Sequence, residues 1–498
     1  MENAERFSSE DLAMAREATY LRAHEFEKGK IQLTDSTNAE RLYREHGENI
    51  RYMAAWKKWL VWNGSRWEVD EGNSMIQEKC LATIRGIHRE VLRTGNIRER
   101  IEIEKFATLS ENARRRKSCV EMATLIKELN ITSECLDTNP WLLNCRNGTV
   151  NLLTGEFTEH KQPDFITKMA NVNYNPKADC PLWKEFIRQI MNYKADVMEF
   201  LQTASGWAVT GDNIEQTMFI LFGSGANGKT TFLNTLMYLL GDYATATPTE
   251  TFMRKSGEQI TNDIARLRGT RFVTTTEAEQ GRRLSEPLIK KITGNDLMTA
   301  RFLYGEYFNF VPTFKIFMAT NHKPVIKGTD YGIWRRIKLI PFTTRIPEDK
   351  QDKRLEEKLK AEASGILNWL LEGAARWKKD GLNAPSAVLN ATDEYRGEMD
   401  VIGNFLNDCC IVKEGANIRI RELFKAYSDW CDDNNENAVS ERFFSMRLKE
   451  IGYKQCRTSE AMAVRGILLF TFKTAASLPI AECSEAERSK RLSSGERR

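Results

Sequence analysis

The chain has 498 residues, of which 41% are hydrophobic and 29% are charged, and its formal net charge is +4. These values are typical of a globular protein with about three domains, and they exclude a polycation that binds nucleic acid through its overall charge. No long uncharged apolar run that could cross a bilayer is present, and the polar N-terminal segment does not resemble a secretory leader. The 10 cysteines include no C-x-x-C pair, so free thiols in a reducing cytosol are expected rather than a zinc site.

The first part of the chain predicts a polar segment followed by a mixed α+β domain. Residues 1–35 are mostly polar, and residues 36–190 form the expected domain. Within it, WLVWNGSRWEV and TVNLLTGEFTEH each predict a β-hairpin, because apolar alternation is interrupted by turn residues. A helical stretch over 76–130 lies between them. It includes the basic run ENARRRKS, which could contact DNA or face solvent.

From residue 191 the pattern changes to short apolar strands that alternate with helices. Strands are expected at TMFILFG, RFVTTTE, KIFMATN and IKLIPF, with a helix at KTTFLNTLMYLLG. This alternation predicts a parallel α/β sheet over residues 191–348, followed by a helical segment over 349–395. Residues 396–474 predict a small separate unit. The tail over 475–498 has few apolar residues and is expected to be disordered.

The segment GSGANGKTT fits the pattern G-x-x-x-x-G-K-[ST] and lies between a predicted strand and a predicted helix. Glycines allow backbone N–H groups to surround phosphate, and the N-terminal end of the helix attracts the same anion. Lys229 is expected to reach the β- and γ-phosphates of ATP, and the Thr230 hydroxyl to bind Mg²⁺. The predicted nucleotide-binding residues are Gly223, Ser224, Gly225, Ala226, Asn227, Gly228, Lys229, Thr230 and Thr231.

Polar residues follow two of the other predicted strands. An ATPase needs a carboxylate at the end of a strand that neighbours the glycine loop, where it holds Mg²⁺ and polarises the attacking water. Glu277 and Glu279 suit that place, and we assign Glu277, at the strand end, as the second metal ligand; either acid could take either role, and both could be exposed loop acids. Asn321 ends KIFMATN and is expected to sense the γ-phosphate, unless it is an ordinary strand-end asparagine.

Arg335 and Arg336 follow Asn321 closely and precede the last predicted strand. A cation in this place cannot easily curl back to the nucleotide of its own chain, but it could enter the site of the next subunit as an arginine finger. Such a contact requires a closed head-to-tail ring. The alternative for either arginine is a plain surface charge.

Between Glu279 and Asn321 the sequence predicts a short helix, which Ser285 could cap, and then a hairpin that turns at Tyr304. Cations with interleaved aromatic residues suit a single nucleic-acid strand, through phosphate contacts and base stacking. In the alternative interpretation, the phenylalanines of this hairpin are core residues and its cations face solvent. The candidate DNA contacts are Lys290, Lys291, Arg301 and Tyr304.

The C-terminal unit predicts two helices, RIRELFKAYSDWCDDN and SERFFSMRLKEIG, and then two strands. Ser440 is a plausible N-cap of the second helix. This order suggests a winged helix, in which Arg442, Arg447 and Lys449 could lie on duplex DNA. A protein-docking module is the alternative.

The ordered set GSGANGKTT, TTTEAEQGRRLSE, LIKKITGNDLMTARFLYGE, MATNHKP and GIWRRIKLIPF resembles the superfamily 3 helicases. The closest resemblance is to the helicase half of phage and plasmid primases of the satellite-phage type, which is similar to the poxvirus helicase-primase. Upstream, NAERLYREHGENIRYMAAWKKWLVWNGSRWEVD and LLNCRNGTVNLLTGEFTEH resemble the helicase-associated domain of that family. The resemblance covers residues 36–470.

This resemblance implies an AAA+ ATPase core that binds ATP and Mg²⁺, a hexameric ring and 3′-to-5′ unwinding. It gives the acidic motif to Glu277 and Glu279, the sensor to Asn321 and the finger to residues 335–336. The hairpin over 299–310 matches the element that grips DNA in the channel. Longer relatives carry an N-terminal primase. Because only 35 residues precede the helicase-associated domain here, no primer synthesis is expected and a separate primase would be a partner.

The expected function is that of an ATP-dependent replicative DNA helicase of a phage, plasmid or integrated element. It would act on single-stranded and forked DNA in the cytoplasm of a bacterial host. The alternative is an origin-binding initiator, switched by ATP, with little unwinding activity. A GTPase or small-molecule kinase is disfavoured, because no N-K-x-D motif follows the glycine loop.

Overall fold

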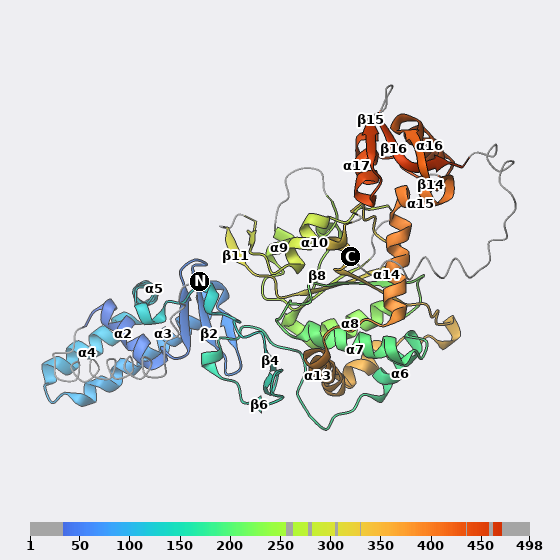
Figure 1. Cartoon of the computed structure of the whole chain (residues 1–498). Helices are drawn as coiled ribbons and strands as arrows, with labels where there is room; N and C mark the ends of the chain where they lie inside the picture. Colours follow the sequence, from blue (N-terminus) through green and yellow to red (C-terminus); the bar gives the residue numbers. More distant parts are fainter. Residues whose placement is uncertain are drawn as a thin grey trace.

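The computed structural model describes residues 33–254, 262–276, 281–303, 307–328, 330–434, 436–457 and 462–470. Three predicted site residues, Glu277, Glu279 and Tyr304, lie outside these ranges, as do residues 1–32 and the tail over 475–498. Figure 1 shows an N-terminal body, a central body around a sheet, and a small C-terminal unit. None of the described helices has the length and apolar run that crossing a bilayer requires.

The N-terminal body combines helices with small antiparallel sheets, as the predicted α+β domain requires. Its helices are α2 (Asp35–His46), α3 (Ser74–Gly86), α4 (Ile97–Ser110) and α5 (Ala113–Ala123). One sheet contains β1 (Ile50–Met53), β2 (Lys58–Trp62) and β3 (Trp67–Val69), and the other contains β4 (Leu142–Cys145), β5 (Gly148–Asn151) and β6 (Phe157–Thr158). The antiparallel pairs β2–β3 and β5–β6 confirm the two predicted hairpins.

The central sheet is parallel, as predicted, and its strand order is β13-β7-β12-β9-β8. Its strands are β7 (Met218–Phe222), β8 (Ala244–Ala246), β9 (Phe272–Thr276), β12 (Lys315–Thr320) and β13 (Ile337–Pro341). The expectation that the acid-bearing strand neighbours the glycine-loop strand is wrong, because β12 lies between β7 and β9. The crossover after β7 leads to β8 at the far edge of the sheet, and the later strands β9 and β12 fill the two positions between them.

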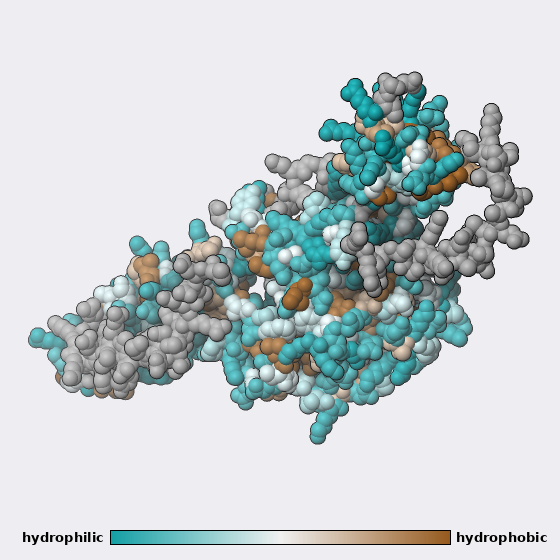
Figure 2. Space-filling model, viewed as in Figure 1, coloured by the Kyte–Doolittle hydropathy of each residue, from teal (hydrophilic) through white to brown (hydrophobic). Residues whose placement is uncertain are grey.

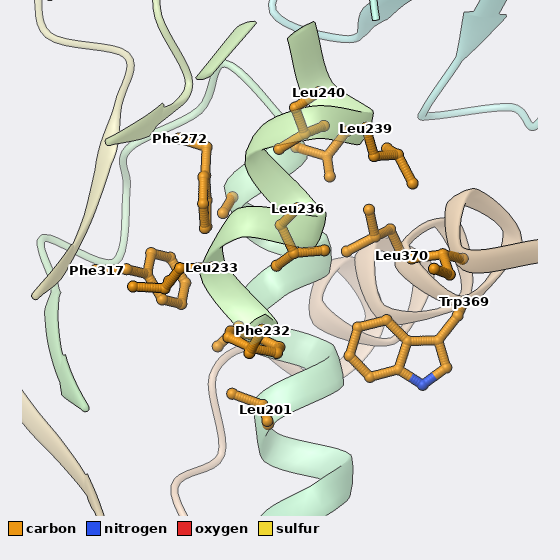
Figure 3. Close-up of a cluster of buried hydrophobic side chains, with 14 of the residues drawn as sticks. Leu201, Phe232, Leu233, Leu236, Leu239, Leu240, Phe272, Phe317, Trp369 and Leu370 are labelled. Carbon is orange, nitrogen blue, oxygen red and sulfur yellow. The ribbon is translucent and has the colours of Figure 1, made fainter. Parts of the chain in front are cut away.

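Helices pack on both faces of this sheet. One face carries α6 (Pro181–Ile190), α7 (Ala195–Val209), α8 (Lys229–Leu240), α12 (Leu355–Ala361) and α13 (Ala363–Asp380). In Figure 3 the apolar side chains of α8 lie between Phe272 and Phe317 of the sheet and Trp369 and Leu370 of α13. The same core includes Leu143 of β4, so it extends across residue 190, the expected domain boundary. The domain boundaries themselves stay predictions.

The other face carries α9 (Asn262–Ala265), α10 (Glu286–Thr293), α11 (Tyr331–Trp334) and α14 (Ser386–Met399). The strands β10 (Met298–Ala300) and β11 (Phe308–Phe310) pair antiparallel, which confirms the predicted hairpin. Ser285 occupies the N-cap position of α10, as predicted, but its side chain makes no capping hydrogen bond. Short 3₁₀ helices occur at Glu71–Asn73, Ile87–Arg93, Lys127–Leu129, Ser133–Cys135, Gln162–Asp164, Gly241–Tyr243, Thr249–Thr251 and Glu348–Lys350.

The C-terminal unit contains more elements than the sequence predicted. The expected helices α16 (Ile420–Asp433) and α17 (Glu441–Ile451) and the strands β15 (Gln455–Arg457) and β16 (Met462–Leu469) are present. The Ser440 side chain accepts a hydrogen bond from the Phe443 N–H, which confirms that cap. Helix α15 (Val401–Cys409) and strand β14 (Cys410–Arg419) precede them, and the sheet order is β14-β16-β15.

Candidate active site

The glycine loop connects β7 to α8 and has the backbone shape that its glycines allow. Gly225 and Gly228 have φ of 65° and 81°, in the left-handed region that favours glycine. A Cβ on Gly223 would lie 2.2 Å from the Phe342 carbonyl oxygen, so no larger residue fits there. Ala226 also has a positive φ, of 49°, which is costly for a residue with a side chain. Strain of this kind gathers at functional sites.

Lys229 is the first residue of α8 and is buried inside this loop, with 5% of its surface exposed. Its Nζ donates to the Gly223 carbonyl at 2.6 Å and to Asn227 Oδ1 at 3.0 Å. It also donates to Asn321 Oδ1 at 3.1 Å. The structure therefore brings together the predicted phosphate-binding lysine and the predicted sensor, which are 92 residues apart in the chain.

A cavity of about 290 Å³ opens at the loop. This is at the small end of ligand pockets, which suits the phosphates of a nucleotide better than a whole nucleotide. Exposed Thr230 lies at the N-terminal end of α8, a helix of 12 residues whose free N–H groups favour an anion. The cavity is lined by Gly225, Ala226, Asn227, Gly228, Lys229, Thr230, Thr231, Ala319, Thr320 and Asn321.

Of the two predicted metal ligands, Thr230 lies within the described residues and Glu277 does not. Thr230 lines the cavity, so its hydroxyl is available to a metal that bridges phosphates. Glu277 and Glu279 lie outside the described residues, so their metal and water roles stay predictions.

The two arginines of the predicted finger have different surroundings. The Arg336 side chain is half-buried, and it donates to Thr293 Oγ1 at 3.1 Å and to Gln216 Oε1 at 3.2 Å. Burial lowers the pKa of the Arg336 guanidinium, and the neighbouring Arg335 lowers it further. Arg335 is exposed and also hydrogen-bonds Gln216. Of the two, Arg335 is the one that can reach another molecule.

Both arginines lie at the sheet edge opposite the glycine loop. The Arg336 carbonyl accepts from the Met218 N–H, at the start of β7, at 2.7 Å. The loop follows the other end of β7, at Phe222. Both arginines therefore lie at the end of the sheet away from the glycine loop of their own chain.

The predicted DNA contacts near the hairpin are not equally available. The Lys290 ammonium pairs with both Asp330 carboxylate oxygens, at 2.9 and 3.0 Å, whereas Lys291 is exposed. The Arg301 guanidinium lies over the ring of exposed Tyr307, 4.8 Å from its centroid. Tyr304 lies outside the described residues.

The predicted DNA contacts on α17 also divide into exposed cations and one that is paired within the chain. Arg442 and Lys449 are exposed. Arg447 pairs with Glu450 at 3.1 Å and with Asp400, the N-cap residue of α15, at 3.6 Å. Its charge is used within the chain, so the structure favours the other two as contacts to a nucleic acid.

Sequence reasoning missed Lys323, two residues after Asn321. Its ammonium lies 2.7 Å from the Glu398 carboxylate, near the end of α14, and 4.9 Å from the centroid of the Phe222 ring. The loop after the predicted sensor is therefore attached to the helix that leads into the C-terminal unit. No local pattern indicates this contact, because its partner is 75 residues away.

Three regions of the chain match known protein families. Residues 39–192 match the family described as "D5 N terminal like", and residues 397–478 match "Poxvirus D5 protein-like". The chain resembles D5-like helicase-primase proteins. This confirms the likeness to the poxvirus protein predicted from the motifs. Residues 221–336, which include the glycine loop, match a "family of unknown function (DUF5906)".

Relatives of this chain come from DNA viruses. It is 28% identical over 426 residues to "Putative helicase L207/L206" of Acanthamoeba polyphaga mimivirus, a match covering 76% of this chain and 43% of that protein. It is 26% identical to "Putative helicase 022R" of Frog virus 3, covering 49% and 27% of the two chains. It is 23% identical to "Putative primase C962R" of African swine fever virus, covering 64% and 36%.

The chain thus spans less than half the length of these relatives. The solved structure of the "NrS-1 C terminal region" is 10% identical, with a TM-score of 0.46, over 86% of this chain and 98% of that one. A likeness at this level supports no conclusion.

Proposed function

We propose that this chain is an ATP-dependent DNA helicase that acts in replication. The names of its relatives support a helicase-like or primase-like replication function. The proposal of an ATPase rests on one contact: Lys229, which is buried in the glycine loop, donates a hydrogen bond to Asn321 at the carboxyl edge of the parallel sheet. This arrangement supports an AAA+ ATPase core that binds ATP and Mg²⁺. In the proposed core Lys229 would hold the phosphates, and Asn321, which Lys229 contacts, would sense the γ-phosphate.

The position of Arg335 supports a ring of subunits, which we propose to be a hexamer. Since this exposed arginine lies at the sheet edge away from its own nucleotide site, it can serve hydrolysis only in the site of a neighbour. Hydrolysis around the ring would then move the β10–β11 hairpin and one DNA strand, in the 3′-to-5′ direction that the resemblance implies.

We further propose that the C-terminal unit is a winged helix that contacts duplex DNA. The order helix, strand, helix, helix and hairpin in α15 through β16 supports it, as do exposed Arg442 and Lys449 on α17. A protein-docking role remains the alternative, because Phe443 and Met446 on the same helix are 39% and 49% exposed.

The test is strand displacement on forked duplexes with a 3′ or a 5′ tail, in the presence of ATP and Mg²⁺. Wild type should displace the strand only from the 3′-tailed substrate, and Lys229→Ala should not. Lys177→Ala, which changes an exposed lysine outside the loop, is the matched control. Hydrolysis without displacement on either substrate would favour the origin-binding initiator instead.

The same preparation tests one further expectation. Template-dependent primer synthesis by the chain alone would overturn the expectation of no primase activity, which the primase-named relatives leave open. The phage, plasmid or integrated-element origin and the bacterial host also stay predictions, since the relatives above are proteins of other viruses.

A further inference from the structure

Four planar side chains form a row between the N-terminal body and the β10–β11 hairpin. The Arg268 guanidinium lies 5.6 Å from the centroid of the Trp56 ring and 5.1 Å from that of Phe308. Phe308 in turn stacks on Phe302, with centroids 5.5 Å apart and an interplanar angle of 29°. The row joins the β1–β2 turn, the turn after α9, and both arms of the hairpin.

The row is open to solvent at both ends. Trp56 is 38% exposed and Phe302 is 46% exposed. Beside it, Tyr307 is 63% exposed under the Arg301 guanidinium. Figure 2 shows apolar surface at this end of the central body, where Figure 1 places β11. Large exposed aromatic surfaces of this kind mark a binding site on a soluble protein.

Arg268 contributes its planar face to the row more than its charge. It donates to the Ser133 carbonyl at 3.2 Å, which fixes the plane of the guanidinium. Burial lowers the pKa of Arg268, while the carboxylates of Glu134 and Asp137 act in the opposite direction. These two carboxylates compete with any phosphate for the cation, so a backbone contact is disfavoured and stacking is favoured.

We propose that Trp56, Arg268, Phe308 and Phe302 form a stacking platform for the bases of single-stranded DNA. The platform extends the path of the strand from the hairpin onto the N-terminal body. Every base has a π-face, so bases can stack on the exposed rings at the two ends of the row, Trp56 and Phe302, without their sequence being read. This inference rests on the proposed helicase function, and it names a base-binding surface separate from the lysines and arginines assigned above.

The test compares binding of the full chain to fluorescent dT20 and to an abasic strand of equal length, by anisotropy at fixed salt. Wild type should prefer dT20. Trp56→Leu and Phe302→Leu should each reduce that preference by about tenfold, because leucine keeps apolar volume but has no π-face. Trp56→Tyr should keep it. Phe157→Leu, at a ring that is 39% exposed on β6, is the matched control and should change nothing.

Two results would overturn the platform. One is an equal affinity of wild type for the two strands. The other is an unchanged base preference in both leucine variants. If these variants also lost self-association, seen by sedimentation, the row would be a contact between copies of the chain. Failure of the helicase proposal looks different, since strand displacement would be absent while the base preference remained.

Discussion

Removing the Arg335 guanidinium should abolish hydrolysis in the site of a neighbour and leave the site of the same chain intact. Arg335 precedes β13, and the glycine loop follows the opposite end of the adjacent, parallel β7. The five residues of strand between these ends span about 17 Å, and the arginine side chain projects from the far end. The guanidinium therefore cannot reach phosphates bound at Lys229 of its own chain.

The assay is ATP hydrolysis by mixed rings. Lys229→Ala and Arg335→Ala should each be inactive alone, with losses of the order of 10³-fold for a missing finger. In a 1:1 mixture, a working site needs an intact Lys229 from one subunit and an intact Arg335 from the next. Random assembly should therefore restore about a quarter of the wild-type activity. Arg335 is exposed, so its loss should change the free energy of unfolding by less than about 0.5 kcal/mol.

The reasoning is refuted if the mixture stays inactive while sedimentation shows that the two variants assemble together. It is also refuted if Arg335→Ala alone hydrolyses ATP at the wild-type rate.

Four other results are expected. Arg336→Ala should lower the free energy of unfolding by about 1–3 kcal/mol in urea titrations, because the half-buried guanidinium holds several hydrogen bonds. Lys323→Glu should destabilise the chain in the same assay, and adding Glu398→Lys should recover most of the loss, since the pair is 2.7 Å apart. Phe444→Ala should cost about 3–5 kcal/mol in the C-terminal unit, where the ring is fully buried, while ATP hydrolysis by the rest of the chain continues. Burial holds the pKa of Lys315 well below its ordinary value, so the folded chain binds fewer protons than the unfolded chain. The free energy of unfolding should therefore rise as the pH increases towards about 10.4. Lys315→Met should reduce this pH dependence in denaturant titrations between about pH 7.5 and 9.5.

Local patterns were sufficient to predict most of the elements. The glycine loop, the strands around it and three hairpins depend on residues that are neighbours in sequence, such as the turn residues between Trp62 and Trp67. The strand order could not be predicted in this way. Whether β9 or β12 lies beside β7 depends on how the crossovers pack, and both strands are buried, so their burial does not distinguish the two positions.

Strand β14 of the C-terminal unit was missed for a related reason. Strand β14 is mostly exposed and contains Gly415, so its sequence shows neither the alternation nor the apolar content that identifies a strand. It is held by pairing with β16, about fifty residues further along the chain. Whether this segment forms a strand therefore depends on tertiary contacts, which a local sequence pattern does not contain.

For the candidate DNA contacts, the number of basic residues in a sequence segment does not predict which of them are available to bind phosphate. Lys290 and Lys291 are adjacent in sequence, yet the structure pairs the first with Asp330 and leaves the second exposed. On α17, Arg447 is likewise paired with Asp400, while Lys449 is exposed. Asp330 is 40 residues from Lys290, and Asp400 is also distant from Arg447 in sequence, so no local window contains these partners; only Glu450, which also pairs with Arg447, is a local neighbour. A phosphate contact requires a cation that is not already neutralised, and that condition is decided by the fold. The exposed members of each set are therefore the ones whose removal should lower the salt dependence of DNA binding, by about one unit of slope per lost contact.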